Sequence, residues 1–283
     1  MQEPTLTPES GFLRLRVDFS YDGTNFSGWA KQRDQRTIQA EMESALEPIT
    51  RNPVALTVAG RTDAGVHATG QVAHFDLPER DHEADEWDLS DITYRLNRIL
   101  PEDIRVNSII KAPPFFHARF SATSRSYLYK IADGGSLLAP LDRFDTAPWY
   151  RNLDVTKMNQ AIAPLIGEHD FAAFCKARDT GTTIRTLKEF SFERTEKNLI
   201  KARITADAFC HSMVRSLVGA AVCVGEGRFE GQWMESLLLG KERVGESLVF
   251  PARGLTLTQV TYPREEELEA RLSITVRRRD EDE

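Results

Sequence analysis

The feature that most constrains the fold of this chain is the order in which short segments of two hydrophobic periods follow one another. Residues 12–20, FLRLRVDFS, alternate apolar with polar or charged side chains, as half-buried strands do. Thr37 can cap a helix with apolar residues at helical spacing, and Pro48 is expected to end the regular part of that helix early. The first domain therefore begins with a strand and a helix.

Four further segments complete this domain. Residues 54–60 and 66–76 favour two strands, and residues 103–110 favour a closing strand. A second helix begins near Asp88, and its apolar face carries Ile92, Leu96, Ile99 and Leu100. The resulting order, β-α-β-β-α-β, is that of the ferredoxin-like unit.

The second half of the sequence repeats this order with longer connections. Its strands are expected at 119–133, 186–196, 199–207 and 255–263, and its helices at 155–165 and 209–225. The fold class is therefore α+β, and we expect two ferredoxin-like domains whose antiparallel sheets merge around a central cleft. The expected parts are an N-terminal extension at 1–11, domains at 12–115 and 116–263, and a charged, solvated tail at 264–283.

Composition narrows the classes of function. No apolar run approaches the roughly 20 residues of a membrane span, and the polar N-terminus lacks a secretory signal pattern, so a cytoplasmic protein is expected. Cys175, Cys210 and Cys223 form no C-x-x-C pair and are expected to be buried, reduced thiols. Because the formal net charge is −7, a nucleic-acid partner would need a locally basic surface.

The segment GRTDAGVHA, residues 60–68, displays one carboxylate in a turn between two predicted strands. Asp63 lies between Gly60 and Gly65, and taken alone it is most simply the side chain of an Asx-turn. The spacing of the two glycines matches a P-loop, but the Lys and Ser/Thr that such a loop requires are missing from the sequence. This excludes nucleoside triphosphate binding.

Metal and protease chemistry receive little support. His67 and His74 are seven residues apart on one predicted strand, so they face opposite sides of the sheet and cannot share a metal. The H-x-E and P-C-x-x-C motifs of zinc deaminases are missing from the sequence. The D-T-G at 179–181 resembles an aspartic-protease signature without its second copy, so residues 178–183 are expected to form a surface loop.

Two segments of the second half carry basic and aromatic side chains. Arg125, Tyr127 and Tyr129 recur at period two and so share a strand face, which suits stacking on single-stranded or flipped bases. A sheet face half buried under a helix is an equally good interpretation. His211 and Arg215 are four residues apart and are expected to share one helix face, where an arginine often has a carboxylate partner.

Five segments, in their order along the chain, closely resemble the tRNA pseudouridine synthase A family. They are YDGTNFSGW (21–29), GRTDAGVHA (60–68), FSATSRSYLYKI (120–131), FCHSMVRSLVG (209–219) and PARGLTLTQVTYP (251–263). The resemblance covers roughly residues 12–263, and the string G-R-T-D-x-G-V-H-A is its most specific part. One departure is Ala30, which stands where the family usually has Gln.

The resemblance implies an enzyme that isomerises uridine to pseudouridine at nucleotides 38, 39 and 40 in the anticodon stem-loop of tRNA. It implies that Asp63 is the catalytic aspartate, Tyr127 the active-site tyrosine and Arg215 the arginine that pairs with the aspartate. The candidate substrate-binding residues are Arg61, which matches a residue implicated in extruding the target base, and Arg125, Tyr129 and His211. The family resemblance further implies a homodimer that binds tRNA across both subunits and uses neither metal nor cofactor.

Physical chemistry makes these roles intelligible. Moving C1′ from N1 to C5 of the base is an isomerisation without net redox change or hydrolysis, so no cofactor is demanded. An ionised Asp63 can attack C6 or C1′, or act as a base, and Arg215 can keep it charged. A stacked nucleotide must be flipped out of its stem, and stacking on Tyr127 offsets part of that cost. Tyr127 can also help to remove the C5 proton, whereas His67 is expected to be structural.

Two other classes of function remain open at this point. A catalytically silent RNA-binding module would keep the basic, aromatic face and would need no pairing of Asp63 with Arg215. A carboxylate-dependent hydrolase would act without RNA.

Overall fold

A computed structural model of the chain describes residues 6–80, 87–135, 137–176, 182–196, 198–241 and 249–282. The chain divides into two compact units. Unit 1 comprises the described residues of Met1–Thr123 and Gln259–Glu281, and unit 2 those of Ser124–Thr258. Each unit combines helices with a sheet, so the α+β class is confirmed.

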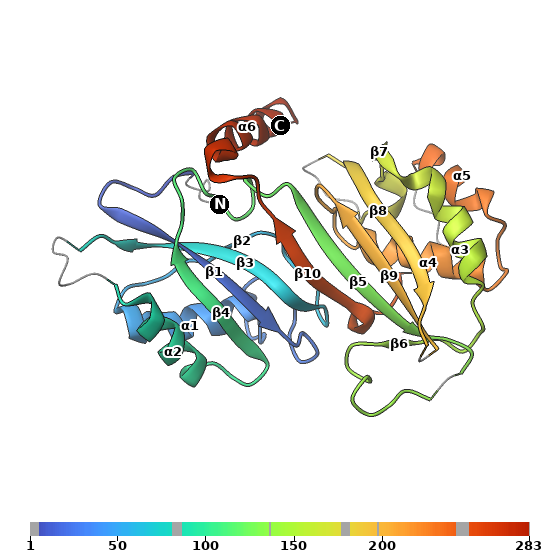
Figure 1. Cartoon of the computed structure of the whole chain (residues 1–283), viewed down its shortest axis with the longest axis horizontal. Helices are drawn as coiled ribbons and strands as arrows, with labels where there is room; N and C mark the ends of the chain where they lie inside the picture. Colours follow the sequence, from blue (N-terminus) through green and yellow to red (C-terminus); the bar gives the residue numbers. More distant parts are fainter. Residues whose placement is uncertain are drawn as a thin grey trace. The chain divides into compact units, whose positions relative to one another are not determined.

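Unit 1 follows the predicted order of elements. These are β1 (Phe12–Tyr21), α1 (Ile38–Thr50), β2 (Thr57–Val58), β3 (His67–Pro78), α2 (Leu89–Ile99) and β4 (Ile104–Lys111). The strands pair in the order β4-β1-β3, with β2 on β3, and every one of these pairs is antiparallel. Helices α1 and α2 contact each other, and α2 packs beside β4 (Figure 1).

Local signals explain the boundaries of these elements. The Thr37 hydroxyl accepts a hydrogen bond from the N–H of Ala40, as expected of a helix cap. The prediction that Pro48 ends α1 early was wrong, because the helix continues to Thr50. A proline in the last turn removes only one helical hydrogen bond, and the burial of Ile49 holds that turn against the core.

Helix α2 begins as predicted, because the Asp88 carboxylate accepts a hydrogen bond from the N–H of Asp91 at 2.9 Å. Ile92, Leu96 and Leu100 are buried. Ile99, which we assigned to the same apolar face, is 52% exposed. The apolar stripe at the end of this helix is therefore narrower than the spacing suggested.

Unit 2 contains more elements than predicted. They are β5 (Ser124–Ala132), β6 (Ala147–Pro148), α3 (Val155–Ile162), β7 (Gly167–Asp170), β8 (Ile184–Arg194), β9 (Leu199–Ala206), α4 (Met213–Gly225) and α5 (Gln232–Gly240). Its sheet has the order β5-β9-β8-β7, with β6 parallel to β5 and the other pairs antiparallel. The sequence analysis missed β6 and β7, because neither strand is long enough for an alternating pattern. It also missed the helix α5.

The C-terminal part of the chain begins with β10 (Leu255–Thr261), whose residues divide between the two units. The charged tail is not merely solvated, because it forms helix α6 (Leu268–Asp282). Leu268 and Leu272 are buried, and an Arg271 Nη2–H donates to the Ala122 carbonyl at 2.9 Å. These contacts hold the first turns of α6 on unit 1.

Two further points follow from the described ranges. None of the helices there combines the length and the apolar character needed to cross a bilayer. The loop predicted at 178–183 lies mostly outside the described residues, since 177–181 are not among them.

Candidate active site

Asp63 lies in the turn between β2 and β3, as the sequence predicted. The turn is closed by a hydrogen bond from the N–H of Val66 to the Asp63 carbonyl at 3.2 Å, and Gly65 has a φ of 77°, which favours glycine. The Asp63 side chain is half-buried and that of Arg61 is exposed. The turn therefore holds the Asp63 carboxylate in a position that is only partly covered by other residues.

The segment from Gly23 to Trp29 packs against the backbone of this turn. The Trp29 N–H donates to the Thr62 carbonyl at 3.1 Å, and the Gly65 N–H donates to the Phe26 carbonyl at 3.3 Å. A Cβ at Gly28, whose φ is 97°, would lie 3.0 Å from the Thr62 carbonyl oxygen. The role of this segment was missed at the sequence level, although its two glycines at 23 and 28 were a signal of close backbone approach.

His67 lies at the start of β3 and is buried. Its Nδ1 accepts a hydrogen bond from the Gly23 N–H at 3.1 Å and lies 3.1 Å from an Asp22 carboxylate oxygen. Burial raises the pKa of Asp22, but the hydrogen bonds from the Thr24 side chain and backbone outweigh it, so that the pKa lies below its usual value. The contacts of His67 therefore support the structural role that we expected for it.

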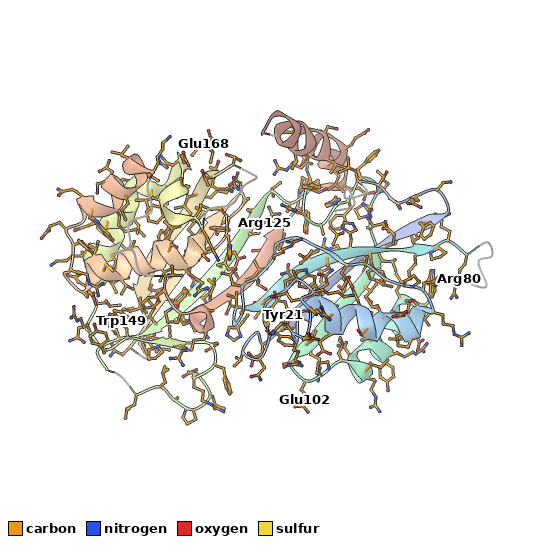
Figure 2. The ribbon with its side chains drawn as sticks, turned by 180° about the vertical axis from the view of Figure 1, so that it is seen from behind. Tyr21, Arg80, Glu102, Arg125, Trp149 and Glu168 are labelled. Carbon is orange, nitrogen blue, oxygen red and sulfur yellow. A yellow bond between two sulfur atoms is a disulfide. The ribbon has the colours of Figure 1, made fainter. Side chains whose placement is uncertain are left out.

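The basic and aromatic strand is β5, and its side chains alternate as predicted. Arg125, Tyr127 and Tyr129 are buried, whereas the residues between them are partly exposed. Arg125 is labelled in Figure 2. Its Nη1–H donates to the Asp207 carbonyl at 2.7 Å. The Tyr127 ring meets the Phe209 ring edge to face, with centroids 5.2 Å apart.

Tyr129 differs from its neighbours on this face because none of its surface is exposed. Its hydroxyl donates to the Pro251 carbonyl, and its ring packs 5.5 Å from that of Phe250. Burial raises the pKa of Tyr129, despite the nearby cations of Arg215 and Arg253, so the hydroxyl stays protonated. A ring with no exposed surface cannot stack on a base, so the structure contradicts a stacking role for Tyr129.

Arg215 lies in the first turn of α4. Every other residue of this helix is buried, and Arg215 alone is partly exposed. Its Nε–H donates to the Phe250 carbonyl at 2.8 Å, and its own carbonyl accepts from the Phe250 N–H at 3.1 Å. The Nε end of the Arg215 guanidinium is therefore fixed to the segment that precedes β10.

The predicted pairing of His211 with Arg215 on one helix face was wrong. Helix α4 begins only at Met213, and Ser212 has a left-handed φ of 64°. His211 lies in the turn before the helix, where its carbonyl accepts a hydrogen bond from the Lys176 N–H at 2.9 Å. Tertiary bonding to the 175–176 segment thus replaces the first helical turn that the apolar spacing suggested.

The cysteines also differ from expectation. Cys175 and Cys210 are joined by a disulfide, with Cα atoms 5.7 Å apart, whereas Cys223 is a buried free cysteine. The two residues are 35 positions apart, so no local spacing revealed the pair. The disulfide connects the end of a short 3-10 helix (Ala172–Phe174) to the turn that carries His211.

The histidines and carboxylates form no evident metal centre in the described ranges. His67 and His74 have separate partners, since His74 Nδ1 accepts from the Ala118 N–H at 3.1 Å. No group of three or more His, Cys, Asp or Glu side chains in the part of the chain that the structure describes could hold a metal ion.

Comparison with known proteins shows what this arrangement belongs to. A family model described as tRNA pseudouridine synthase matches residues 19–121 and 161–263. The curated tRNA pseudouridine synthase A of Frankia casuarinae is 51% identical over 266 residues, covering 94% of this chain and 95% of the relative. That of Streptomyces griseus is 48% identical over 269 residues, covering 93% of this chain and 93% of the relative. That of Cutibacterium acnes is 47% identical over 262 residues, covering 91% of this chain and 92% of the relative.

These matches define an enzyme that forms pseudouridine in tRNA, an isomerase. Both alternatives left open by the sequence, a silent RNA-binding module and a carboxylate-dependent hydrolase, are thereby set aside. The chain belongs to the tRNA pseudouridine synthase A family.

Proposed function

We propose that this enzyme isomerises uridine at positions 38, 39 and 40 of the tRNA anticodon stem-loop, with Asp63 as the catalytic carboxylate. The observation that carries the proposal is the turn at 60–66, which holds one half-buried carboxylate on a backbone that is hydrogen-bonded to Phe26 and Trp29. A preorganised carboxylate needs no further reorganisation when the base arrives. Asp63 then attacks C6 or C1′, or removes a proton that starts elimination.

Arg215 is the proposed cationic partner of Asp63. Its Nε is anchored on the Phe250 carbonyl, so the pairing would use the terminal Nη groups. A guanidinium held in this way keeps a carboxylate ionised and oriented, because a bidentate pair favours the charged form.

The remaining roles concern the flipped nucleotide. Tyr127, held edge to face by Phe209, stacks on the target base and helps to remove the C5 proton. The exposed Arg61 reaches the phosphate backbone or the vacated stack. Arg125 and His211 contribute to substrate binding, while the buried Tyr129 packs against Phe250.

The proposal extends to partners and architecture. The enzyme works as a cytoplasmic homodimer that binds tRNA across both subunits and needs neither metal nor cofactor. Its halves are two ferredoxin-like domains. The order β-α-β-β-α-β of unit 1 and its strand order β4-β1-β3 with β2 on β3 support this classification.

A direct test compares wild type, Asp63→Asn and Asp34→Asn on a tRNA transcript with tritium at C5 of its uridines. Asp34 is a suitable control because its side chain is 90% exposed and the chemical change is the same. We expect tritium release to fall by at least about a thousandfold for Asp63→Asn, because an amide is a poor nucleophile and a poor base, and to be unchanged for Asp34→Asn.

Two outcomes would contradict the proposal. Near-normal release by Asp63→Asn would remove Asp63 from the chemistry. Transcripts in which the uridines at 38, 39 and 40 are replaced by cytidine test the target positions, since continued release from them would place the reaction elsewhere in the tRNA.

A further inference from the structure

Beneath the Asp63 turn lie three buried polar side chains that the proposed mechanism does not use. Tyr21 is 4% exposed, Thr62 6% and Gln71 0%. Tyr21, labelled in Figure 2, is the last residue of β1, and Gln71 lies on β3. Burying a polar group costs free energy unless its hydrogen bonds are satisfied, so an apolar residue would be the simpler choice at each position.

The strand itself shows that Tyr21 is an exception. The buried apolar side chains that precede it on β1 are Leu15, Val17 and Phe19. Tyr21 continues this apolar row at period two and adds a single hydroxyl at its end.

The hydrogen bonds of Gln71 run in a determined direction. The Val72 N–H donates to Gln71 Oε1 at 3.2 Å, which identifies the other amide atom as the Nε2 donor. Nε2 donates to the Tyr21 hydroxyl at 3.2 Å and to the Gly60 carbonyl at 3.0 Å. The Tyr21 hydroxyl also shares a hydrogen bond of 2.8 Å with Thr62 Oγ1, in which either hydroxyl can be the donor.

Burial raises the pKa of Tyr21 to about 12, although its hydrogen bonds to Thr62 and Gln71 lower it. The hydroxyl therefore stays neutral at any working pH and keeps its hydrogen bond with Thr62.

The network reaches the turn at two points just before the catalytic carboxylate. Gln71 holds the Gly60 carbonyl, and Tyr21 holds the Thr62 side chain. The Thr62 carbonyl is held from the opposite side by the Trp29 N–H. The backbone that leads into Asp63 is thus fixed through both the side chain and the carbonyl of the preceding residue.

We propose that Tyr21 is a positioning residue, which acts through Thr62 and Gln71 to hold the Asp63 carboxylate in its reactive orientation. This inference rests on the proposed catalytic role of Asp63. A misplacement of about 1 Å can cost about a hundredfold in rate, so loss of one anchor of the turn should slow chemistry about tenfold. It should not weaken tRNA binding, which depends mainly on phosphate contacts.

The test uses Tyr21→Phe, Thr62→Val and Thr62→Ser. Phe keeps the ring and removes the hydroxyl, Val keeps the volume of Thr and removes Oγ1, and Ser keeps Oγ1. The control is Thr50→Val, because Thr50 is 2% exposed and its hydroxyl donates within α1 to Leu46, away from the turn. Each variant is measured for its single-turnover rate of tritium release at saturating tRNA, its tRNA Kd and its Tm.

We expect Tyr21→Phe and Thr62→Val to slow the single-turnover step about tenfold, with a Kd within about twofold of wild type. Thr62→Ser should restore most of the rate. Tyr21→Phe combined with Thr62→Val should be no slower than Thr62→Val alone, because both remove one interaction. Thr50→Val should lower the Tm without slowing the reaction.

A wild-type rate in Tyr21→Phe, or equal slowing by Thr50→Val, would overturn the positioning role. Should Tyr21→Phe fail to fold, the pair Thr62→Val and Thr62→Ser decides, and equal rates in that pair would overturn the inference as well. Failure of the proposed function looks different, since Asp63→Asn would then stay active while wild type and every variant of the network turn over normally.

Discussion

Gly28→Ala tests whether the position of the Asp63 turn is set by the segment packed against it. Gly28 has a φ of 97°, and an added Cβ would lie 3.0 Å from the Thr62 carbonyl oxygen, 3.2 Å from the Ala64 nitrogen and 3.3 Å from the Asp63 carbonyl carbon. All three atoms belong to the backbone of the turn. The methyl group can therefore be accommodated only if the turn moves by a few tenths of an ångström.

Two costs add up in this variant. An L-residue held at positive φ costs about 1–2 kcal/mol, and overpacking against backbone costs about 1–3 kcal/mol. We expect the free energy of unfolding to fall by about 2–5 kcal/mol, depending on how far the turn relaxes. Because relaxation displaces Asp63, the single-turnover rate should also fall about tenfold, with little change in tRNA affinity.

Gly11→Ala is the matched control. Gly11 has a φ of 82°, but an added Cβ meets no heavy atom within 4 Å. Backbone strain alone should therefore lower its free energy of unfolding, by about 1–2 kcal/mol, and its single-turnover rate should be unchanged. Urea denaturation and single-turnover tritium release measure the two quantities. A Gly28→Ala enzyme with wild-type rate, or a Gly11→Ala enzyme slowed to the same extent, would refute the reasoning.

Four other outcomes are expected. Cys175→Ser should destabilise unit 2 by roughly 4 kcal/mol, from the loop entropy of a 35-residue separation, and reduction of the wild-type disulfide should reproduce the loss in denaturation experiments. Burial lowers the pKa of His117 from 6.5 to about 3, helped by Arg14 and Arg119. The neutral form is therefore favoured on folding, and stability present above pH 6.5 should be lost at up to about 1.4 kcal/mol per pH unit as the pH falls toward 3, a slope that His117→Gln should reduce. Affinity for tRNA should drop steeply between low and moderate salt despite the net charge of −7, and a flat profile would argue against phosphate contacts. Removal of residues 274–283 should leave activity nearly intact, because the buried Leu268 and Leu272 remain; loss of tRNA binding would assign the tail a role.

Much of unit 1 could be read from the sequence because the signals are local. Alternation over 12–20 predicted β1, Thr37 and Asp88 marked two helix starts, and the glycine-flanked Asp63 marked a turn between strands. Each of these signals depends on residues within about four positions of one another, where side-chain direction and backbone hydrogen bonding are coupled. The carboxylate that we propose as catalytic was therefore visible before any tertiary contact was known.

Other features were decided only by the tertiary structure. The start of α4 follows from bonds between the 210–212 turn and the 175–176 segment, and those bonds override the apolar spacing that predicted an earlier start at 209. Tyr129 has the same spacing as Tyr127, but packing against Phe250 and Pro251 removes its surface from any substrate. Periodicity shows which side chains share a face and does not show what covers that face.

The supports of the Asp63 turn show the same limit. Tyr21 and Thr62 are 41 positions apart, and the disulfide joins cysteines 35 positions apart. The sequence by itself determined the strands of unit 1, its two helix caps and the displayed carboxylate, because short-range geometry specifies them. Only the tertiary structure decided which distant groups meet. The residues next to a hydroxyl or a thiol in the sequence do not reveal its partner, because the packing of the whole unit brings the two groups together.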